Sequence, residues 1–144
     1  MCVSLDENLE ERGVQLHHLG WAVRSLEKSR SHFEGELGLP FAGVEDFPTL
    51  RVAFYRAGAT LIELLEPLTD EDDVARFLQE RGEGIHHCAY QVPDVADELL
   101  AAERRGLRLI DRVPRPGARG TSIGFADPRR QDAVLVEYVQ EPSR

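Results

Sequence analysis

The chain has 144 residues, of which 42% are hydrophobic and 30% charged, as in a soluble globular domain or in two small halves that share a core. Its net charge of −9 and the lack of a basic cluster make nucleic acid an unfavourable partner, and no run of about eighteen apolar residues predicts a membrane span. The acidic start, MCVSLDENLEERG, has neither the basic nor the apolar part of a signal peptide, so we expect a cytoplasmic protein.

Residues 1–13 are predicted to form an N-terminal extension outside the fold. Alternating β-formers over 14–23 predict a strand. Ser25 then caps a helix that runs to about Leu37, with Leu26, Phe33 and Leu37 on one face and Gly38 as the stop. Three strands are expected to follow, near residues 41–47, 50–56 and 60–66, and a helix over 70–82 acts as a linker.

The second part of the chain predicts the same order of elements. A strand over 85–92 leads to a helix that is capped by Asp94 and runs to Arg105. Further strands are expected near residues 107–112, 121–126 and 134–139. Residues 114–120, PRPGARG, are too rich in proline and glycine for regular structure, and we expect a loop there.

An internal repeat explains why both parts of the chain predict the same order of elements. HHLGWAVRSL at 17–26 resembles HHCAYQVPDV at 86–95, and LIELLEP at 61–67 resembles LVEYVQE at 135–141. The repeat predicts one α+β domain over residues 14–140, made of two tandem βαβββ halves, 14–68 and 83–140, joined by the helical linker. The curved sheets of the two halves are expected to form one cleft.

Strand parity selects one histidine from each pair, because alternate side chains of a strand point to opposite faces. His18 shares a face with two small residues, and His87 shares one with Ala89 and Gln91, which leaves room for a ligand. The other members of these strands are bulky and suit packing under a helix. His17 and His86 are therefore predicted to lie behind the ligands or beneath a helix.

The last strand of each half carries one carboxylate between apolar residues, Glu63 in the first half and Glu137 in the second. A carboxylate there is costly to bury without a partner. A single histidine on a strand is more often structural, and a lone mid-strand glutamate usually faces solvent. The same residue types at equivalent places in both halves instead favour one divalent metal ion (Co, Mn, Ni, Fe or Zn) held by His18, Glu63, His87 and Glu137.

These stretches resemble the vicinal-oxygen-chelate, or glyoxalase/dioxygenase-like, superfamily, and most of all its methylmalonyl-CoA epimerase branch, over about residues 15–140. The resemblance is carried by the segments HHLGWAV (17–23), RVAFYRAGATLIELLEP (51–67), RGEGIHH (81–87), RLIDRVPRPGARG (108–120) and VLVE (134–137). It implies a glyoxalase-like fold, a homodimer, and His18, His87 and Glu137 as metal ligands, with Glu63 as the fourth ligand or a water-mediated neighbour.

The same resemblance implies an isomerase. An epimerase of this family removes the proton α to a thioester carbonyl through an enolate and returns it on the opposite face, with carboxylates as acid and base. The expected catalytic residues are Glu137, Glu63 and Glu45. The acyl-CoA is expected to contact Gln91 and the loop residues Arg115, Gly117, Ala118 and Arg119.

The chain departs from the epimerase pattern at one point that matters for catalysis. The family has a glutamate in a Pro-Glu-Gln-like segment, where this chain has the shorter VEDFPTL at 44–50, with Thr49 after the proline. Glu45 and Asp46 are both left as possible replacements. The chain also has Asp127-Pro128-Arg129 and Asp132-Ala133 in place of a His-Pro-Lys turn and a Gly-Gly pair.

Two other functions stay open on the sequence. One is a divergent metalloenzyme of the same superfamily, such as a lyase or a tailoring isomerase or cyclase, which the missing glutamate favours. The other is a non-catalytic protein that binds a small molecule on the same fold. The two cysteines, Cys2 and Cys88, are far apart and are predicted to be free thiols.

Overall fold

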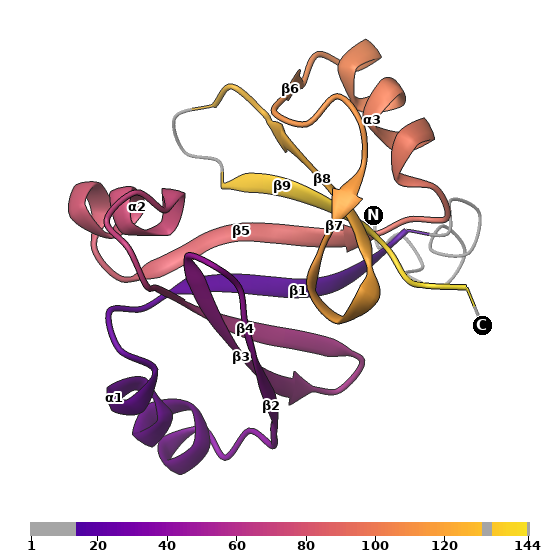
Figure 1. The fold of residues 1–144 in the computed structure, drawn as a ribbon. Coiled ribbons are helices and arrows are strands. Elements are labelled where there is room, and N and C mark those ends of the chain that lie inside the picture. Colours follow the sequence, from indigo (N-terminus) through magenta and orange to yellow (C-terminus); the bar gives the residue numbers. More distant parts are fainter. Residues whose placement is uncertain (1–13, 131–133, 144) are drawn as a thin grey trace, which may run out of the picture. The chain divides into compact units, whose positions relative to one another are not determined.

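The computed structural model describes residues 14–130 and 134–143 and shows a mixed α+β chain (Figure 1). The chain divides into two compact units, one of residues 18–88 and one of residues 89–144 together with residues 1–17. The predicted N-terminal extension and the Asp132-Ala133 pair lie outside the described residues. Within the described residues, no helix is both long and apolar enough to cross a membrane.

The unit of residues 18–88 contains most of the first predicted half, the linker helix and the start of the next strand. Its strands lie in the order β2-β3-β4-β1-β5, with β1 parallel to β4 and the β2–β3 and β3–β4 pairs antiparallel. The elements are β1 (Gln15–Ala22), α1 (Leu26–Arg30), η1 (Ser31–Glu36), β2 (Phe41–Asp46), β3 (Leu50–Ala57), β4 (Thr60–Pro67), α2 (Asp73–Arg81) and the first part of β5 (Gly84–Gln91).

The first helix begins as predicted, because the Ser25 side chain accepts a hydrogen bond from the backbone N–H of Lys28. Its second part, η1, is a π-helical turn in which the backbone N–H of Leu37 donates to the carbonyl of His32. A π turn inserts an extra residue into the helical repeat and rotates the positions that follow. Leu37 is consequently 51% exposed, so its predicted place on the buried face is wrong.

The helix side of this unit holds an apolar core. Its buried members are Val23, Leu26, Phe33, Ala53, Tyr55 and Leu64. Trp21 packs against this cluster, which confirms that the bulky residues of the first strand lie under the helix. The opposite sheet face is therefore the one on which His18 and the small residues of β1 lie.

The second unit repeats this arrangement with shorter strands. The last part of β5 lies beside β9 (Leu135–Gln140), followed by β8 (Ser122–Asp127) and β6 (Arg108–Leu109), and β7 (Arg115–Pro116) also pairs with β8. The helix α3 (Val95–Arg104) is capped by Asp94, as predicted, and it covers Ala126 and Tyr138. Residue Gly106, just past the helix, has a positive φ of 103° that suits glycine.

Two predictions about this unit are wrong. The strand expected over 107–112 is only two residues long, because the backbone N–H groups of Ile110 and Asp111 both donate to the carbonyl of Phe125, and the Asp111 carboxylate accepts from the N–H of Phe125. The Asp111 side chain thus accepts the backbone N–H of Phe125, where a longer strand would offer a backbone carbonyl. The 114–120 segment is not irregular either, since it contains β7 and a short 3-10 turn, η2 (Ala118–Gly120).

Cys88 is a free thiol, as predicted, and Cys2 lies outside the described residues. The half boundaries at 14–68 and 83–140, and the cleft between the halves, stay predictions.

Candidate metal centre

The face of β1 that carries His18 is lined by small residues. Gly20 and Ala22 follow His18 at alternate positions, and all three are buried. His18 itself is only 4% exposed. A histidine that is buried beside glycine and alanine has room for a partner on the same face of the sheet.

That partner is the imidazole of His87 on β5. The Nε2 atoms of His18 and His87 lie 3.1 Å apart, and the two rings are nearly perpendicular, with an interplanar angle of 85°. His87 is 5% exposed. The absence of a side chain at Gly20 allows this arrangement, because a Cβ there would overlap the His87 ring.

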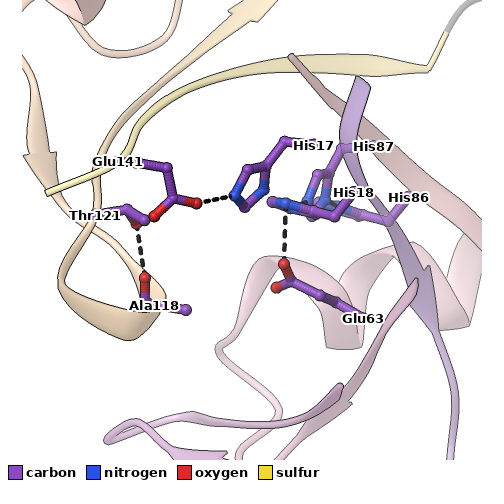
Figure 2. A network of polar contacts seen from close by, with 8 residues as sticks. All are labelled: His17, His18, Glu63, His86, His87, Ala118, Thr121 and Glu141. Carbon is purple, nitrogen blue, oxygen red and sulfur yellow. Dashed lines mark hydrogen bonds and ion pairs between the residues drawn. The ribbon is translucent and has the colours of Figure 1, made fainter. Parts of the chain in front are cut away.

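Glu63 lies on β4 directly beside Gly20 in the parallel pair and is also buried, at 6% exposure. Its Oε2 lies 2.9 Å from Nδ1 of His18, where a ring N–H donates to the carboxylate (Figure 2). The carboxylate therefore contacts the side of the His18 ring that faces away from His87. This geometry fits a carboxylate that orients a histidine ligand.

The donor set fits a divalent transition metal. Only one proton fits between the two facing Nε2 atoms, so at least one of them presents a lone pair toward the other ring. Two imidazoles with a buried carboxylate are ligands that such metals bind well. Water is largely excluded from these three side chains, which strengthens the interaction of a cation with the carboxylate.

Glu137 belongs to the second unit, where it lies on β9 at 5% exposure. It stands directly across the β8–β9 pair from Phe125 and shares a sheet face with Val139, which is buried with Ile123. The carboxylate is thus buried in an apolar row, as the sequence predicts. Its role as a ligand to the same ion as His18 and His87 stays a prediction.

The first histidine of each pair has a separate partner. His86 lies against Phe77 of α2, and its Nδ1 is 2.9 Å from Nδ1 of His87. His17 lies in the other unit, where its Nε2 is 2.5 Å from Oε1 of Glu141 (Figure 2). Sequence reasoning missed Glu141, because nothing in the pattern of the last residues marks it as a partner of a distant strand.

The structure separates the two candidates for the missing family glutamate. Glu45 on β2 pairs with Val52 on β3, which pairs with Leu65 on β4. Leu65 is two residues along β4 from Glu63, so Glu45 and Glu63 share a sheet face. Asp46 faces the other way and is bonded by Arg51, with its Oδ1 2.6 Å from Nε. That guanidinium holds the pKa of Asp46 below its usual range, which makes Asp46 a weaker base.

Thr49, the residue after the proline of the VEDFPTL segment, has a structural partner. Its hydroxyl donates to Oδ2 of Asp72, the residue that caps α2. The threonine thus ties the start of β3 to the linker helix.

The predicted substrate residues all lie in the second unit. Gln91 accepts a hydrogen bond from the Gln15 amide, so its carbonyl already has a protein partner. In the loop, Gly117 lies so close to Thr121 and Ile123 that a Cβ would overlap them.

The rest of the loop is held by bonds to neighbouring residues, and its arginines, Arg115 and Arg119, are exposed. The carbonyl of Ala118 accepts from the Thr121 hydroxyl (Figure 2), and Arg119 adopts a positive φ of 58°. Arg115 donates from Nε to Asp111 at 3.0 Å and places its guanidinium over the Phe125 ring. The loop therefore holds Arg115 in a fixed position over Phe125, the residue that pairs with Glu137 across β8 and β9.

Comparison with known proteins decides the family. The sequence profile of the glyoxalase/bleomycin resistance protein/dioxygenase superfamily matches residues 17–125. The chain belongs to this superfamily.

Its relatives in the superfamily include epimerases. The chain is 32% identical to an ethylmalonyl-CoA/methylmalonyl-CoA epimerase of Cereibacter sphaeroides, over 88% of this chain and 97% of that protein. It is 42% identical to the uncharacterized protein YqjC of Bacillus subtilis, over 88% of this chain and 91% of that one. A Streptomyces coelicolor methylmalonyl-CoA epimerase variant in complex with 2-nitronate-propionyl-CoA superposes with a TM-score of 0.83 at 27% identity, over 90% of this chain and 95% of that one. This likeness confirms the glyoxalase-like fold.

Proposed function

We propose that the protein is a divalent-metal-dependent epimerase of methylmalonyl-CoA or a related acyl-CoA. The observation that carries the proposal is the buried pair of imidazoles, His18 and His87, whose Nε2 atoms face each other at 3.1 Å. Superfamily relatives named as methylmalonyl-CoA epimerases support the substrate class.

In this proposal, His18, His87 and Glu137 hold the ion, with Glu63 either as a fourth ligand or as the group that orients His18. The ion, when bound, supplies positive charge that stabilises the negative charge developing on a thioester oxygen. The burial of Glu63 and of both imidazoles keeps water from competing for that position.

The chain's own carboxylates would move the α-proton. Epimerisation removes this proton from one face of the α-carbon and returns a proton to the other, so two groups are needed on opposite sides of the substrate. Glu45 is the candidate on the first unit, because it shares the sheet face of Glu63, two strands across and two residues along. Glu137 is the candidate on the second unit.

The proposed contacts for the anionic parts of the acyl-CoA are Arg115 and Arg119 of the 114–120 segment. Both are exposed, and a guanidinium binds carboxylate and phosphate through paired N–H groups. Arg115 is already oriented by Asp111, so it loses little conformational freedom on binding. Gly117 and Ala118 would allow the acyl-CoA to approach the backbone closely.

A divergent metalloenzyme of the same superfamily is the second candidate. The observation that favours it is Thr49, which binds Asp72 where the epimerase pattern has a glutamate. If Glu45 does not act as the base, the same metal centre would serve a lyase or a different isomerase.

The test is α-proton exchange. The protein loaded with Co²⁺ is incubated with methylmalonyl-CoA in D2O, and loss of the α-proton signal is followed by NMR. Exchange that depends on the metal supports the epimerase. Exchange no faster than in the His18→Ala, His87→Ala double variant would exclude it, and the second candidate would then take its place.

A further inference from the structure

We propose that His86 is a positioning residue that holds His87 with its Nε2 toward the metal ion. The inference rests on the metal centre of the proposed function but not on its substrate. It concerns residues that all belong to one compact unit, residues 18–88.

His86 contacts a helix on one side and the His87 ring on the other, as a residue that fixes the orientation of His87 would. On one side its ring packs edge-to-face against Phe77 of α2, with ring centroids 5.2 Å apart. On the other side its Nδ1 lies 2.9 Å from Nδ1 of His87, with the two rings at 87°. His86 therefore links the position of the His87 ring to the linker helix.

The hydrogen-bond chemistry of histidine determines which of the two rings donates in the contact between His86 and His87. A neutral histidine that binds a cation through Nε2 carries its proton on Nδ1 and needs an acceptor there. Nδ1 of His86 lies within hydrogen-bond reach of Nδ1 of His87. A contact between two ring nitrogens holds one proton, so His86 accepts from His87 when it carries its own proton on Nε2.

Both imidazoles of the centre then have the same kind of outer partner. Glu63 contacts Nδ1 of His18 at 2.9 Å, and His86 contacts Nδ1 of His87 at the same distance. Groups that bond the outer nitrogen of a ligand histidine fix its orientation, and their loss typically lowers metal affinity about 10- to 100-fold. The first half of the chain uses a carboxylate for this role, and the second uses a histidine.

Two variants separate the hydrogen bond from the packing. H86F keeps an aromatic ring against Phe77 but has no acceptor for His87. H86N keeps a polar acceptor near the position of Nδ1 but removes the ring. The control is His32→Phe, since His32 is exposed and pairs with Glu36 on η1.

Co²⁺ binding is measured by calorimetry on each metal-free protein, together with the thermal midpoint. We expect H86F to bind Co²⁺ about 10- to 100-fold more weakly with little change in thermal midpoint. H86N should stay within about threefold of the wild type although its midpoint falls, and the His32 control should match the wild type.

Proton NMR of the Co²⁺ protein supplies a second readout. Each ligand histidine gives a shifted, exchangeable ring N–H signal, and we expect H86F to lose or broaden one of the two while the signal of His18 remains. The inference would be overturned by unchanged Co²⁺ affinity in H86F, or by equal losses in H86F and H86N. A wild-type protein that binds no Co²⁺ would overturn the inference and the metal centre together. Co²⁺ binding without α-proton exchange would overturn the epimerase alone.

Discussion

The imidazole of His87 on β5 occupies the space that a side chain at Gly20 on β1 would take. An added Cβ at Gly20 would overlap Cε1, Nδ1 and Nε2 of that ring. Gly20 also lies beside Glu63 on β4, so the glycine makes room for His87 next to the carboxylate that contacts His18.

We therefore expect Gly20→Ala to displace His87 and to lower metal affinity at least tenfold. The crowding should also lower the free energy of unfolding by about 1–3 kcal/mol. Calorimetry with Co²⁺ and urea denaturation measure the two effects. Gly35→Ala is the matched control, since nothing lies within 4 Å of a Cβ there and alanine favours a helical turn. Equal metal affinity in the two variants would contradict the role of Gly20.

Glu137→Leu should remove a ligand and a buried charge together. We expect metal affinity to fall at least 100-fold, because a leucine offers no donor atom. The metal-free protein should be as stable as the wild type or more stable by about 1–3 kcal/mol, since a carboxylate is costly in an apolar row. Metal analysis and thermal unfolding without metal check both parts. An unchanged metal content would show that Glu137 is not a ligand.

Glu45→Gln and Asp46→Asn form a pair of adjacent substitutions on opposite faces of β2. We expect Glu45→Gln to slow α-proton exchange by at least 100-fold, as loss of a general base does. Asp46→Asn should retain exchange near the wild-type rate and change only an exposed ion pair with Arg51. Full exchange in both variants would place the base elsewhere.

Tyr55→Phe tests a hydroxyl of the apolar core under the first helix. The hydroxyl of Tyr55 donates to Glu34 at 2.8 Å, and its loss should cost about 1 kcal/mol of unfolding free energy at neutral pH. Burial, with the Glu34 carboxylate, raises the pKa of Tyr55 to about 12, above its value of 10 in an unfolded chain. As the pH rises, Tyr55 therefore loses its proton at a lower pH in the unfolded chain than in the folded one.

The contribution of Tyr55 is accordingly complete below pH 10 and is lost as the pH rises through about 12. Urea denaturation at pH 9, 10 and 11 should show a steeper loss of stability in the wild type than in Tyr55→Phe. Parallel pH profiles for the two proteins would refute the assigned cause.

Periodicity and capping residues predicted most elements of the fold within one or two residues. Ser25 and Asp94 cap helices as expected, because side-chain capping depends on local sequence alone. Leu37 was misplaced because a π turn has no sequence signature at this position. The short β6 depends on Asp111, and the bond of its carboxylate to the N–H of Phe125, 14 residues along the chain, cannot be seen from spacing.

The candidate site was predictable to the level of strand faces. Parity places His18, His87 and Glu63 correctly, because a strand fixes which side chains share a face. It does not fix which ring nitrogen meets Glu63, since that depends on a side-chain rotamer. The choice between Glu45 and Asp46 depends on the register shift near Gly43, which only the strand pairing of β2 reveals.

The histidine doublet of β5 also affects how this strand finds its register. A shift by one residue that moves His86 into the place of His87 would still leave an imidazole facing the candidate metal centre. Metal binding alone would therefore discriminate poorly against the misaligned strand. The misaligned strand is instead rejected at Ala89, a fully buried position that this shift would give to the larger Cys88.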